Sequence, residues 1–286
     1  MNAYHYHRPR TLEEVFELCR QEPRARLLAG GTDLLVQLRS GRAEAPPALI
    51  SLRGVPELEG VTDGERLRIG AATALTDVAE NALVAQRFPA LIESIAALGS
   101  RQIRNVATLG GNLCNASPGA DTAPPLLVHE ARVELRSPSA SRELALEDFF
   151  SGPGTTRIEE DEILAAVLLD TPAPGSRAVF VRKGRVAMDI ATASVAVHLE
   201  LDGERIVRAR IAAGSVAPVP LRLRSVEALL EGCEPDVDLL QLAQVETSAL
   251  IQPISDLRAT ADYRRKLTGV LLRRALENLL FTRVTA

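Results

Sequence analysis

The chain has 286 residues, of which 46% are hydrophobic and 24% charged, as in an ordinary globular protein that is long enough for two domains. The formal net charge is −4 and no basic cluster occurs, so nucleic acid is not an expected partner. No apolar run approaches the roughly 20 residues that a membrane helix needs, and the N-terminal MNAYHYHRPR has no apolar signal-peptide core. We therefore expect a cytoplasmic protein without a membrane span.

The first half of the chain predicts short strands and helices. Residues 11–14, Thr-Leu-Glu-Glu, form a capping box that opens a helix. A short apolar strand then runs into Gly30-Gly31, and Thr32 or Asp33 caps the following helix, which ends at a glycine. The further predicted elements, in chain order, are strands at 48–52 and 66–72, helices from Thr76 to 82 and at 90–98, a helical turn at 125–129, and strands at 131–137 and 161–169.

The second half begins after a segment that breaks both helix and strand, Thr-Pro-Ala-Pro-Gly at 171–175. Two strands at 191–201 and 205–213 flank Asp202-Gly203, which is a typical hairpin turn. Three helices are expected at 222–231, 237–250 and 262–280. Because strands and helices cluster instead of alternating strictly, the predicted fold class is α+β.

The central segment 101–128, RQIRNVATLGGNLCNASPGADTAPPLLV, is rich in residues that favour turns and coil. We expect a long irregular loop, and such loops inside compact domains usually bind a ligand. Its Gly110-Gly111 pair would let backbone N–H groups approach a diphosphate closely. A single glycine pair is more often a simple turn, but Gly30-Gly31 lies in a similar setting. We therefore predict that the two glycine loops together bind one long phosphate-bearing ligand.

Motifs for a self-contained active site are missing from the sequence. The three cysteines, Cys19, Cys114 and Cys233, form no C-x-x-C, so neither an iron–sulfur cluster nor a zinc site is expected. The four histidines show no metal spacing and no catalytic partners, and we interpret His129 and His198 as structural. There is no G-x-G-x-x-G, no Walker loop and no G-x-S-x-G. These absences favour a carrier whose chemistry belongs to a cofactor.

AGGTDLL at 29–35, together with RNVATLGGNLCNASPGADTAPPLL at 104–127, resembles the FAD-binding medium subunit of the molybdenum hydroxylases. This family includes carbon monoxide dehydrogenase, quinoline oxidoreductases and the FAD domain of xanthine dehydrogenase. The resemblance continues to the C-terminus through FVRKGR at 180–185, DIA at 189–191, GSVAPVPLR at 214–222 and DYRR at 262–265. It implies an FAD-binding domain of the vanillyl-alcohol-oxidase-like (PCMH) type at 1–172, with subdomains of about 1–55 and 56–172, and a smaller α+β domain at 176–286.

The resemblance also implies which residues bind FAD, without a covalent link. The pyrophosphate would lie between the two glycine pairs, with backbone N–H groups and the hydroxyls of Thr32 and Thr108 as donors. Asp121 would accept ribose hydroxyls near the nucleotide end; a cap for a helix that starts at Thr122 is an equally open alternative. The full implied set is Leu27, Leu28, Ala29, Gly30, Gly31, Thr32, Asp33, Leu34, Leu98, Ala107, Thr108, Leu109, Gly110, Gly111, Asn112, Ser117, Asp121, Leu164 and Lys183.

Three members of this set concern the flavin ring. Leu98 stands where xanthine dehydrogenases carry a phenylalanine, so an aromatic contact is lost. Leu164 matches an apolar contact of the family, although by itself it is typical of a core. Lys183 is the candidate cation that would stabilise the reduced, anionic flavin and raise its potential. A register one or two residues away, or a solvated basic turn, is left open.

The implied function is that of the FAD subunit in a heterotrimer, with no acid–base residue of its own. A large subunit would hold molybdopterin and a small one [2Fe–2S] clusters, and electrons would leave through FAD to NAD⁺, a quinone or another acceptor. The sequence leaves open a dimer of heterotrimers and the substrate, whether carbon monoxide, an aldehyde, a purine or another N-heterocycle. Two alternatives remain: a stand-alone flavin-dependent oxidoreductase on the same fold, and a scaffold protein that has lost its cofactor.

Overall fold

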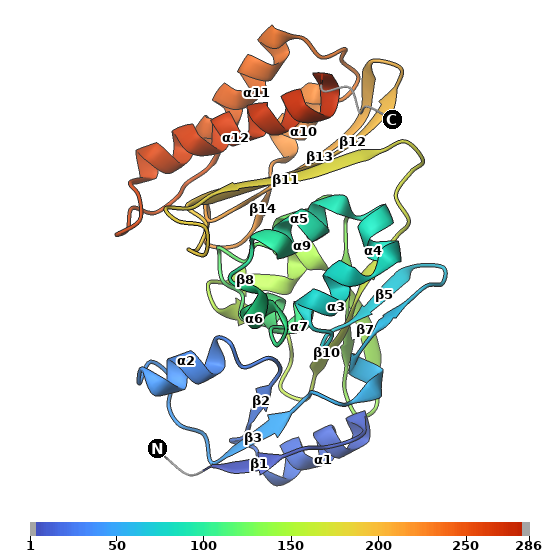
Figure 1. Cartoon of the computed structure of the whole chain (residues 1–286), viewed down its shortest axis with the longest axis vertical. Helices are drawn as coiled ribbons and strands as arrows, with labels where there is room; N and C mark the ends of the chain where they lie inside the picture. The colour runs from blue at the N-terminus through green and yellow to red at the C-terminus, as the bar shows by residue number, and fades with distance from the viewer. Residues whose placement is uncertain (1–3, 282–286) are drawn as a thin grey trace.

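The computed structural model describes residues 4–281 and consists of three layers stacked along its longest axis (Figure 1). A small parallel sheet near the N-terminus forms one end. A five-stranded antiparallel sheet with its helices forms the middle, and a four-stranded sheet covered by the C-terminal helices forms the other end. This arrangement confirms the predicted α+β class.

The first layer is a parallel sheet with the strand order β1–β3–β2. Its elements are β1 (His5–His7), α1 (Leu12–Gln21), β2 (Arg26–Leu28), α2 (Leu34–Arg39) and β3 (Ala48–Ser51). Helix α1 begins as predicted, because Thr11 Oγ1 accepts a hydrogen bond of 3.2 Å from the N–H of Glu14. The Gly30-Gly31 loop connects the end of β2 to α2.

The middle layer is an antiparallel sheet with the order β4–β5–β10–β6–β7 and a set of short helices. Its elements are η1 (Pro56–Leu58), β4 (Val61–Thr62), β5 (Leu67–Gly70), α3 (Leu75–Glu80), α4 (Ala82–Arg87), α5 (Pro89–Ala97), α6 (Arg101–Arg104), α7 (Leu109–Cys114), α8 (Ala123–Val128), β6 (Arg132–Arg136), β7 (Ser141–Ala145), α9 (Leu146–Phe149), β8 (Phe150–Gly152), β9 (Thr155–Thr156) and β10 (Ile163–Leu169). All of β10 is buried: Leu164 packs in the core of this layer, whereas Ile163 and Ala165 pack in the core of the first. Strand β10 thus joins the two layers.

The third layer is an antiparallel sheet with the order β11–β12–β13–β14. Its elements are β11 (Arg177–Lys183), β12 (Ala193–Asp202), β13 (Arg205–Gly214), β14 (Leu221–Arg222), α10 (Arg224–Leu230), α11 (Val237–Leu250) and α12 (Ala261–Phe281). The predicted hairpin is confirmed, with Gly203 at φ +59° in its turn, and so are the three helices. The C-terminal helices contact one side of this layer, while α5 and α8 of the middle layer contact its strands from the other (Figure 1).

The central segment differs from the prediction of a long irregular loop, because it contains the helices α6 and α7, whereas α8 agrees with the predicted helical turn at 125–129. Side-chain caps explain the first two: Ser100 Oγ accepts from the N–H of Ile103, and Thr108 Oγ1 from the N–H of Gly111. In α8 two prolines occupy the first turn, where a missing N–H costs nothing. The turn-rich composition therefore marks helix ends and not an absence of helix.

The predicted helix from Thr76 to residue 82 is also wrong in its start and continuity. Helix α3 starts at Leu75 without a side-chain cap and ends at Glu80, and α4 restarts behind Asn81. The side chain of Asn81 accepts from two N–H groups of α4 and so caps a separate helix. Thr76 instead donates a hydrogen bond of 2.7 Å to Asn105 Oδ1.

None of the helices between residues 4 and 281 is both long and apolar enough to cross a membrane.

Candidate functional site

The two glycine pairs, almost eighty residues apart in the chain, lie against each other in the structure. A Cβ added at Gly30 would overlap the carbonyl oxygen of Val106 and lie 2.7 Å from Cα of Ala107. A Cβ at Gly111 would lie 3.3 Å from Cβ of Ala29. Only glycine allows this approach of backbone to backbone. The two glycine loops therefore contact each other at the junction of the first and middle layers, and we call this contact the glycine junction.

The first loop offers free backbone donors at this junction. Among residues 4–281, no acceptor takes the N–H groups of Gly30, Gly31 or Thr32. Gly31 has φ +71°, and its carbonyl accepts the N–H of Leu35 at 3.0 Å as α2 begins. The predicted side-chain cap from Asp33 is absent, since its carboxylate makes no capping bond. Successive unpaired N–H groups of this kind form a concave site for an anion.

The second loop differs from the prediction, because the backbone N–H groups of residues 109–112 already donate to acceptors within the protein. The N–H of Leu109 donates to Thr73 O, that of Gly110 to Ala71 O at 2.8 Å, and that of Asn112 to Thr108 O. The N–H of Gly111 donates to Thr108 Oγ1 at 3.0 Å. These groups close the loop onto residues 71–75 and are not available to a phosphate. The donors left free among residues 4–281 are the backbone N–H and the hydroxyl proton of Thr108 and the side-chain NH₂ of Asn112, whose oxygen accepts from Thr122.

Residues 115–121 connect this junction to the third layer. Ala116 has φ +44°, and Ser117 Oγ accepts the N–H of Gly119 at 3.2 Å, so the segment is a tight series of turns. The carbonyl of Pro118 accepts the N–H of Ser215 from the third layer at 2.7 Å. The half-buried Ser117 thus lies between the glycine loop and the C-terminal part of the chain.

Asp121 is buried and paired with Arg182, one residue before the predicted Lys183 and within the register left open there; the pairing itself was not predicted. Its Oδ2 accepts from Arg182 Nη1 at 2.9 Å, and the two side chains are 7% and 10% exposed. The other carboxylate oxygen is buried without a hydrogen-bond partner among residues 4–281. Burial raises the pKa of Asp121 to about 6, and the charge of Arg182 opposes this rise. The alternative of a helix cap is wrong, because Thr122 is the N-cap of α8 and no side chain caps that helix.

Arg182 holds three segments together around this carboxylate. Besides Asp121, its guanidinium donates to the carbonyl of Ala97 at 2.6 Å and to the carbonyl of Asp189. The alternation of β11 is the signal that could have identified it. Phe180 packs with the middle layer and Val181 with the third, so Arg182 shares the face of Phe180 while Lys183 points away from it. Lys183 is exposed at the end of β11.

The two predicted apolar contacts occupy different environments. Leu98 follows α5 and is half-buried, and its carbonyl accepts from Arg104 Nη1 at 2.9 Å. Leu98 is therefore accessible at the edge of the middle layer, beside the carbonyl that Arg182 binds. Leu164 is 3% exposed and packs inside the core of the middle layer. The structure thus favours the core interpretation for Leu164.

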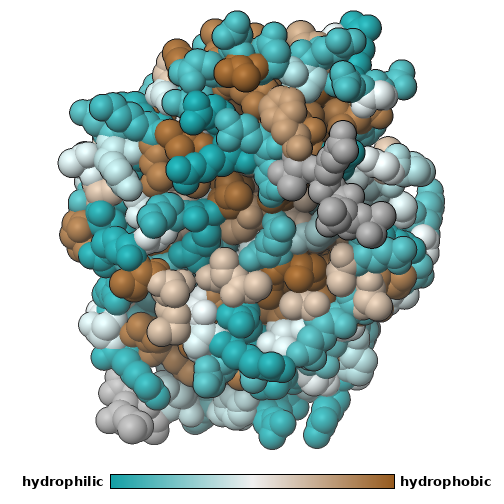
Figure 2. All heavy atoms as spheres, turned by 45° about the horizontal axis from the view of Figure 1, so that its top comes forward, coloured by the Kyte–Doolittle hydropathy of each residue, from teal (hydrophilic) through white to brown (hydrophobic). Residues whose placement is uncertain are grey.

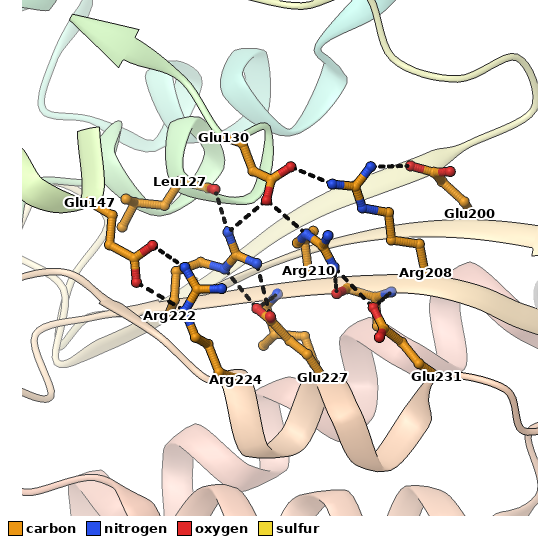
Figure 3. A network of polar contacts seen from close by, with 12 residues as sticks. Leu127, Glu130, Glu147, Glu200, Arg208, Arg210, Arg222, Arg224, Glu227 and Glu231 are labelled. Carbon is orange, nitrogen blue, oxygen red and sulfur yellow. Dashed lines mark hydrogen bonds and ion pairs between the residues drawn. The ribbon is translucent and has the colours of Figure 1, made fainter. Parts of the chain in front are cut away.

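An ionic network with one buried pair, Arg222–Glu227, connects the third layer to the middle layer beside α8 (Figure 3). Arg222 donates to both carboxylate oxygens of Glu227, at 2.7 and 2.8 Å, and to the carbonyl of Leu127 at the end of α8. Glu130, which follows α8, accepts from Arg208 and Arg210 of β13. These contacts hold the third layer at a fixed position relative to residues 115–128.

His129 and His198 lie side by side in the same region, with ring centroids 4.9 Å apart. Burial lowers the pKa of His129 to about 3 and that of His198 to about 4, so both imidazoles are neutral near pH 7. The ring of Phe88 packs edge-on against His129. Neither histidine contacts the glycine junction, which agrees with their structural interpretation.

The assembled site can hold an elongated ligand with an anionic group. Free N–H groups and a threonine hydroxyl lie at the glycine junction, and Asp121, further along the same segment as Gly111, has one buried carboxylate oxygen without a partner among residues 4–281. A dinucleotide with a pyrophosphate and hydroxyl-bearing sugars fits this donor and acceptor set. The residues contain no nucleophile with an adjacent base, so the chemistry belongs to the ligand.

Comparisons with known proteins agree with this geometry. Residues 2–172 match the family described as the FAD binding domain in molybdopterin dehydrogenase, and residues 178–279 match the CO dehydrogenase flavoprotein C-terminal domain. The chain is 34% identical to a putative xanthine dehydrogenase FAD-binding subunit of Escherichia coli, covering 95% of this chain and 94% of that protein. It is 33% identical to the carbon monoxide dehydrogenase medium chain of Afipia carboxidovorans, covering 96% of each.

A solved structure shares the same fold along nearly the whole chain. A chain of carbon monoxide dehydrogenase from Hydrogenophaga pseudoflava superposes with a TM-score of 0.93 at 32% identity, covering 98% of both chains. This protein therefore belongs to the family of FAD-binding flavoprotein subunits of the molybdenum hydroxylases.

Proposed function

We propose that this chain is the medium subunit of a heterotrimeric, molybdopterin-dependent dehydrogenase. In this assignment a large partner subunit holds molybdopterin and a small one holds [2Fe–2S] clusters. FAD, when bound, supplies the chemistry that converts single electrons from the clusters into pairs for NAD⁺, a quinone or another acceptor. The observation that carries the proposal is the contact between the two glycine loops. At this contact the N–H groups of Gly30, Gly31 and Thr32 have no acceptor among residues 4–281.

The chain's own residues would bind and orient the cofactor. The three N–H groups and the hydroxyls of Thr32 and Thr108 donate to the pyrophosphate, and Asn112 adds its side-chain NH₂. The unpartnered oxygen of Asp121 accepts from a ribose hydroxyl. Leu98 covers part of the flavin ring. We assign no residue an acid–base role.

Two residues are candidates for the cation that would lie near the flavin ring, Lys183 and Arg182. Lys183 is exposed, whereas Arg182 donates to three acceptors, which are the carbonyl of Ala97, the carboxylate of Asp121 and the carbonyl of Asp189. An exposed charge is screened by water and ions, so Lys183 could shift a flavin potential only slightly. We therefore expect Arg182 to order the site and Lys183 to tune the potential weakly.

Exposed apolar side chains support a need for partner subunits. Val186 and Met188, in the turn after β11, are 69% and 68% exposed, and Ile254 and Leu257 before α12 are 71% and 80% exposed. On the face that Figure 2 shows, apolar residues gather in several groups between polar ones. Where exposed apolar side chains form a contiguous patch, they mark a protein contact, and these residues are our candidates for one.

The experiment that tests the proposal compares the isolated chain with the chain in its complex. Under anaerobic conditions, carbon monoxide, xanthine or an aldehyde should leave the flavin of the isolated chain oxidised. The correct substrate should reduce it only when the molybdenum and iron–sulfur subunits are added. Reduction of the isolated chain by NADH would identify NAD⁺ as the acceptor, whereas reduction by a substrate without partners would favour the stand-alone flavin oxidoreductase.

A further inference from the structure

A second cluster of ligating side chains lies at the far end of the first layer, away from the glycine junction. We propose that His5, His7 and Glu22 form a binding site for a divalent transition metal ion, with zinc as the expected occupant. One ligand atom from each of these residues lies within 4.8 Å of the other two. We call these three residues the His–His–Glu cluster. The proposal does not depend on the function proposed above.

The fold brings the cluster together from two elements. His5 and His7 are separated by one residue in β1, and side chains two apart in a strand point to the same face. Strand β1 is at the edge of its sheet, pairing only with β3 in the order β1–β3–β2. Glu22 is the C-cap residue of α1, and its Oε1 lies 2.5 Å from His7 Nε2. The end of α1 is thus already folded back onto the strand.

The dimensions suit a metal ion after small side-chain rotations. Tetrahedral zinc with bonds of about 2.0–2.1 Å holds its ligand atoms about 3.3 Å apart. His7 Nε2 and Glu22 Oε1 are 2.5 Å apart, and no separation among the three ligand atoms exceeds 4.8 Å, so none is more than about 1.5 Å longer than that value. The side chains of His7 and Glu22 are 28% and 25% exposed, so an ion can enter from solvent.

The chemistry of the three ligands selects the kind of metal. Two imidazoles and one carboxylate are the borderline nitrogen and oxygen donors that zinc prefers, and they leave a fourth position for water. An all-oxygen ion such as calcium or magnesium would not be favoured by two histidines. Nearby, Glu13, Glu14 and Glu17 face the hollow beside His7 and outnumber Arg8, which favours a cation.

A bound ion would cross-link strand β1 to the C-terminal end of helix α1. The chain between His7 and Glu22 would then form a closed loop. The same sheet carries β2, which leads directly into Gly30. The site therefore stabilises the layer that supplies the free N–H donors.

Spacing explains why sequence analysis overlooked this site. The common metal spacing on a helix is H-x-x-x-H, which this chain lacks, whereas His-x-His on a strand also places two imidazoles on one face. The third ligand is fifteen residues further along, and only the turn between β1 and α1 brings it close.

The test titrates the full chain, freed of metal by a chelator, with Zn²⁺ and follows binding by calorimetry. We expect one zinc per chain and a rise of the melting temperature of the protein with zinc. His5→Gln, His7→Gln and Glu22→Gln should each weaken binding about tenfold or more. Glu80→Gln is the matched control, because Glu80 ends α3 in the middle layer and pairs with Arg101 at the surface; its zinc affinity should equal that of the parent chain.

A second measurement reads the ligands directly. With Cu²⁺ as the probe, electron paramagnetic resonance should show coupling to two imidazole nitrogens in the parent chain and to one in His5→Gln. Zinc affinity unchanged by all three substitutions, or an absence of saturable binding, would overturn the proposal. So would half a zinc per chain accompanied by dimer formation, because the ion would then bridge two copies.

Discussion

Gly30 lies with its Cα against the carbonyl oxygen of Val106, and this contact joins the first layer of the protein to the middle one. No side chain fits there, since an added Cβ would overlap that oxygen and approach Cα of Ala107 to 2.7 Å. Both sides of the contact are backbone, so neither can move away as a flexible side chain could. The glycine is therefore required for packing as well as for access to a phosphate.

Replacing Gly30 by alanine should separate the two loops and weaken FAD binding. We expect a loss of stability of about 3 kcal/mol, because overpacking against rigid backbone is near the upper end of such effects. Bound FAD per chain and the midpoint of urea unfolding both measure it. Gly64→Ala is the control, since a Cβ there would come no closer than 3.7 Å to any atom. Equal FAD content in the two variants would contradict the close contact.

Arg182→Met should be far more harmful than Lys183→Met. Removing Arg182 leaves the carboxylate of Asp121 buried without its ion-pair partner, which typically costs about 3–5 kcal/mol. Lys183 is exposed, and its substitution should change the free energy of unfolding by about 0.5 kcal/mol or less. Chemical unfolding of the two variants separates these effects. Adding Asp121→Asn to Arg182→Met should recover part of the stability, and no recovery would mean that the pair does not interact.

The network in Figure 3 predicts two different outcomes for two ion pairs. Glu227→Gln should destabilise by about 3 kcal/mol, because Arg222 then keeps a buried charge without a carboxylate. Arg224→Ala removes a pair whose side chains are 62% and 39% exposed, and such pairs contribute about 0–1 kcal/mol. Thermal unfolding measured for both variants checks this ranking. Similar melting temperatures would place the Arg222–Glu227 pair in a more solvated environment than the structure shows.

His129 and His198 should make stability decrease as the pH falls below about 6.5. Their pKa values in the folded chain, about 3 and about 4, are below the ordinary value of 6.5. Between these limits the unfolded chain binds protons that the folded chain cannot, so acid favours unfolding. At pH about 5 the loss is about 2 kcal/mol for each histidine.

Substitution isolates this contribution from that of other groups. Urea unfolding at pH about 7 and about 5 should show a smaller pH dependence in His198→Gln and His129→Gln than in the parent chain, whatever the substitution does at neutral pH. The control is His5→Gln, whose side chain belongs to the exposed strand β1. An identical pH dependence in all four proteins would mean that the buried imidazoles become protonated in the folded state.

Local patterns in the sequence were sufficient for much of the fold. The capping box at Thr11, the hairpin at Asp202-Gly203 and the C-terminal helices follow from signals within a few residues. The three-residue strand β1 was not predicted, because a distant partner decides it. The helices α6 and α7 were not predicted either, although Ser100 and Thr108 cap them locally, because turn-rich residues surround both. Strand β1 exists only because β3 pairs with it some forty residues later.

The candidate site was predictable in its location but not in its details. Two glycine pairs with flanking hydroxyls indicated a diphosphate site, and the structure brings them together. The sequence does not show which N–H groups are free. In the folded chain, the N–H groups of Gly110 and Leu109 in the second loop donate to the carbonyls of Ala71 and Thr73. Likewise, Arg182 and Asp121 are 61 residues apart, and only the folded chain identifies them as a pair.

The measurement that tests the central claim most directly is the absorbance of this chain, isolated from its complex, before and after acid precipitation. A non-covalent FAD subunit should be yellow, and acid should release about one FAD per chain into the supernatant. Gly30→Ala, purified in the same way, should release much less. A colourless parent chain, or flavin that stays with the precipitate, would contradict the assignment of the glycine junction as a non-covalent FAD site.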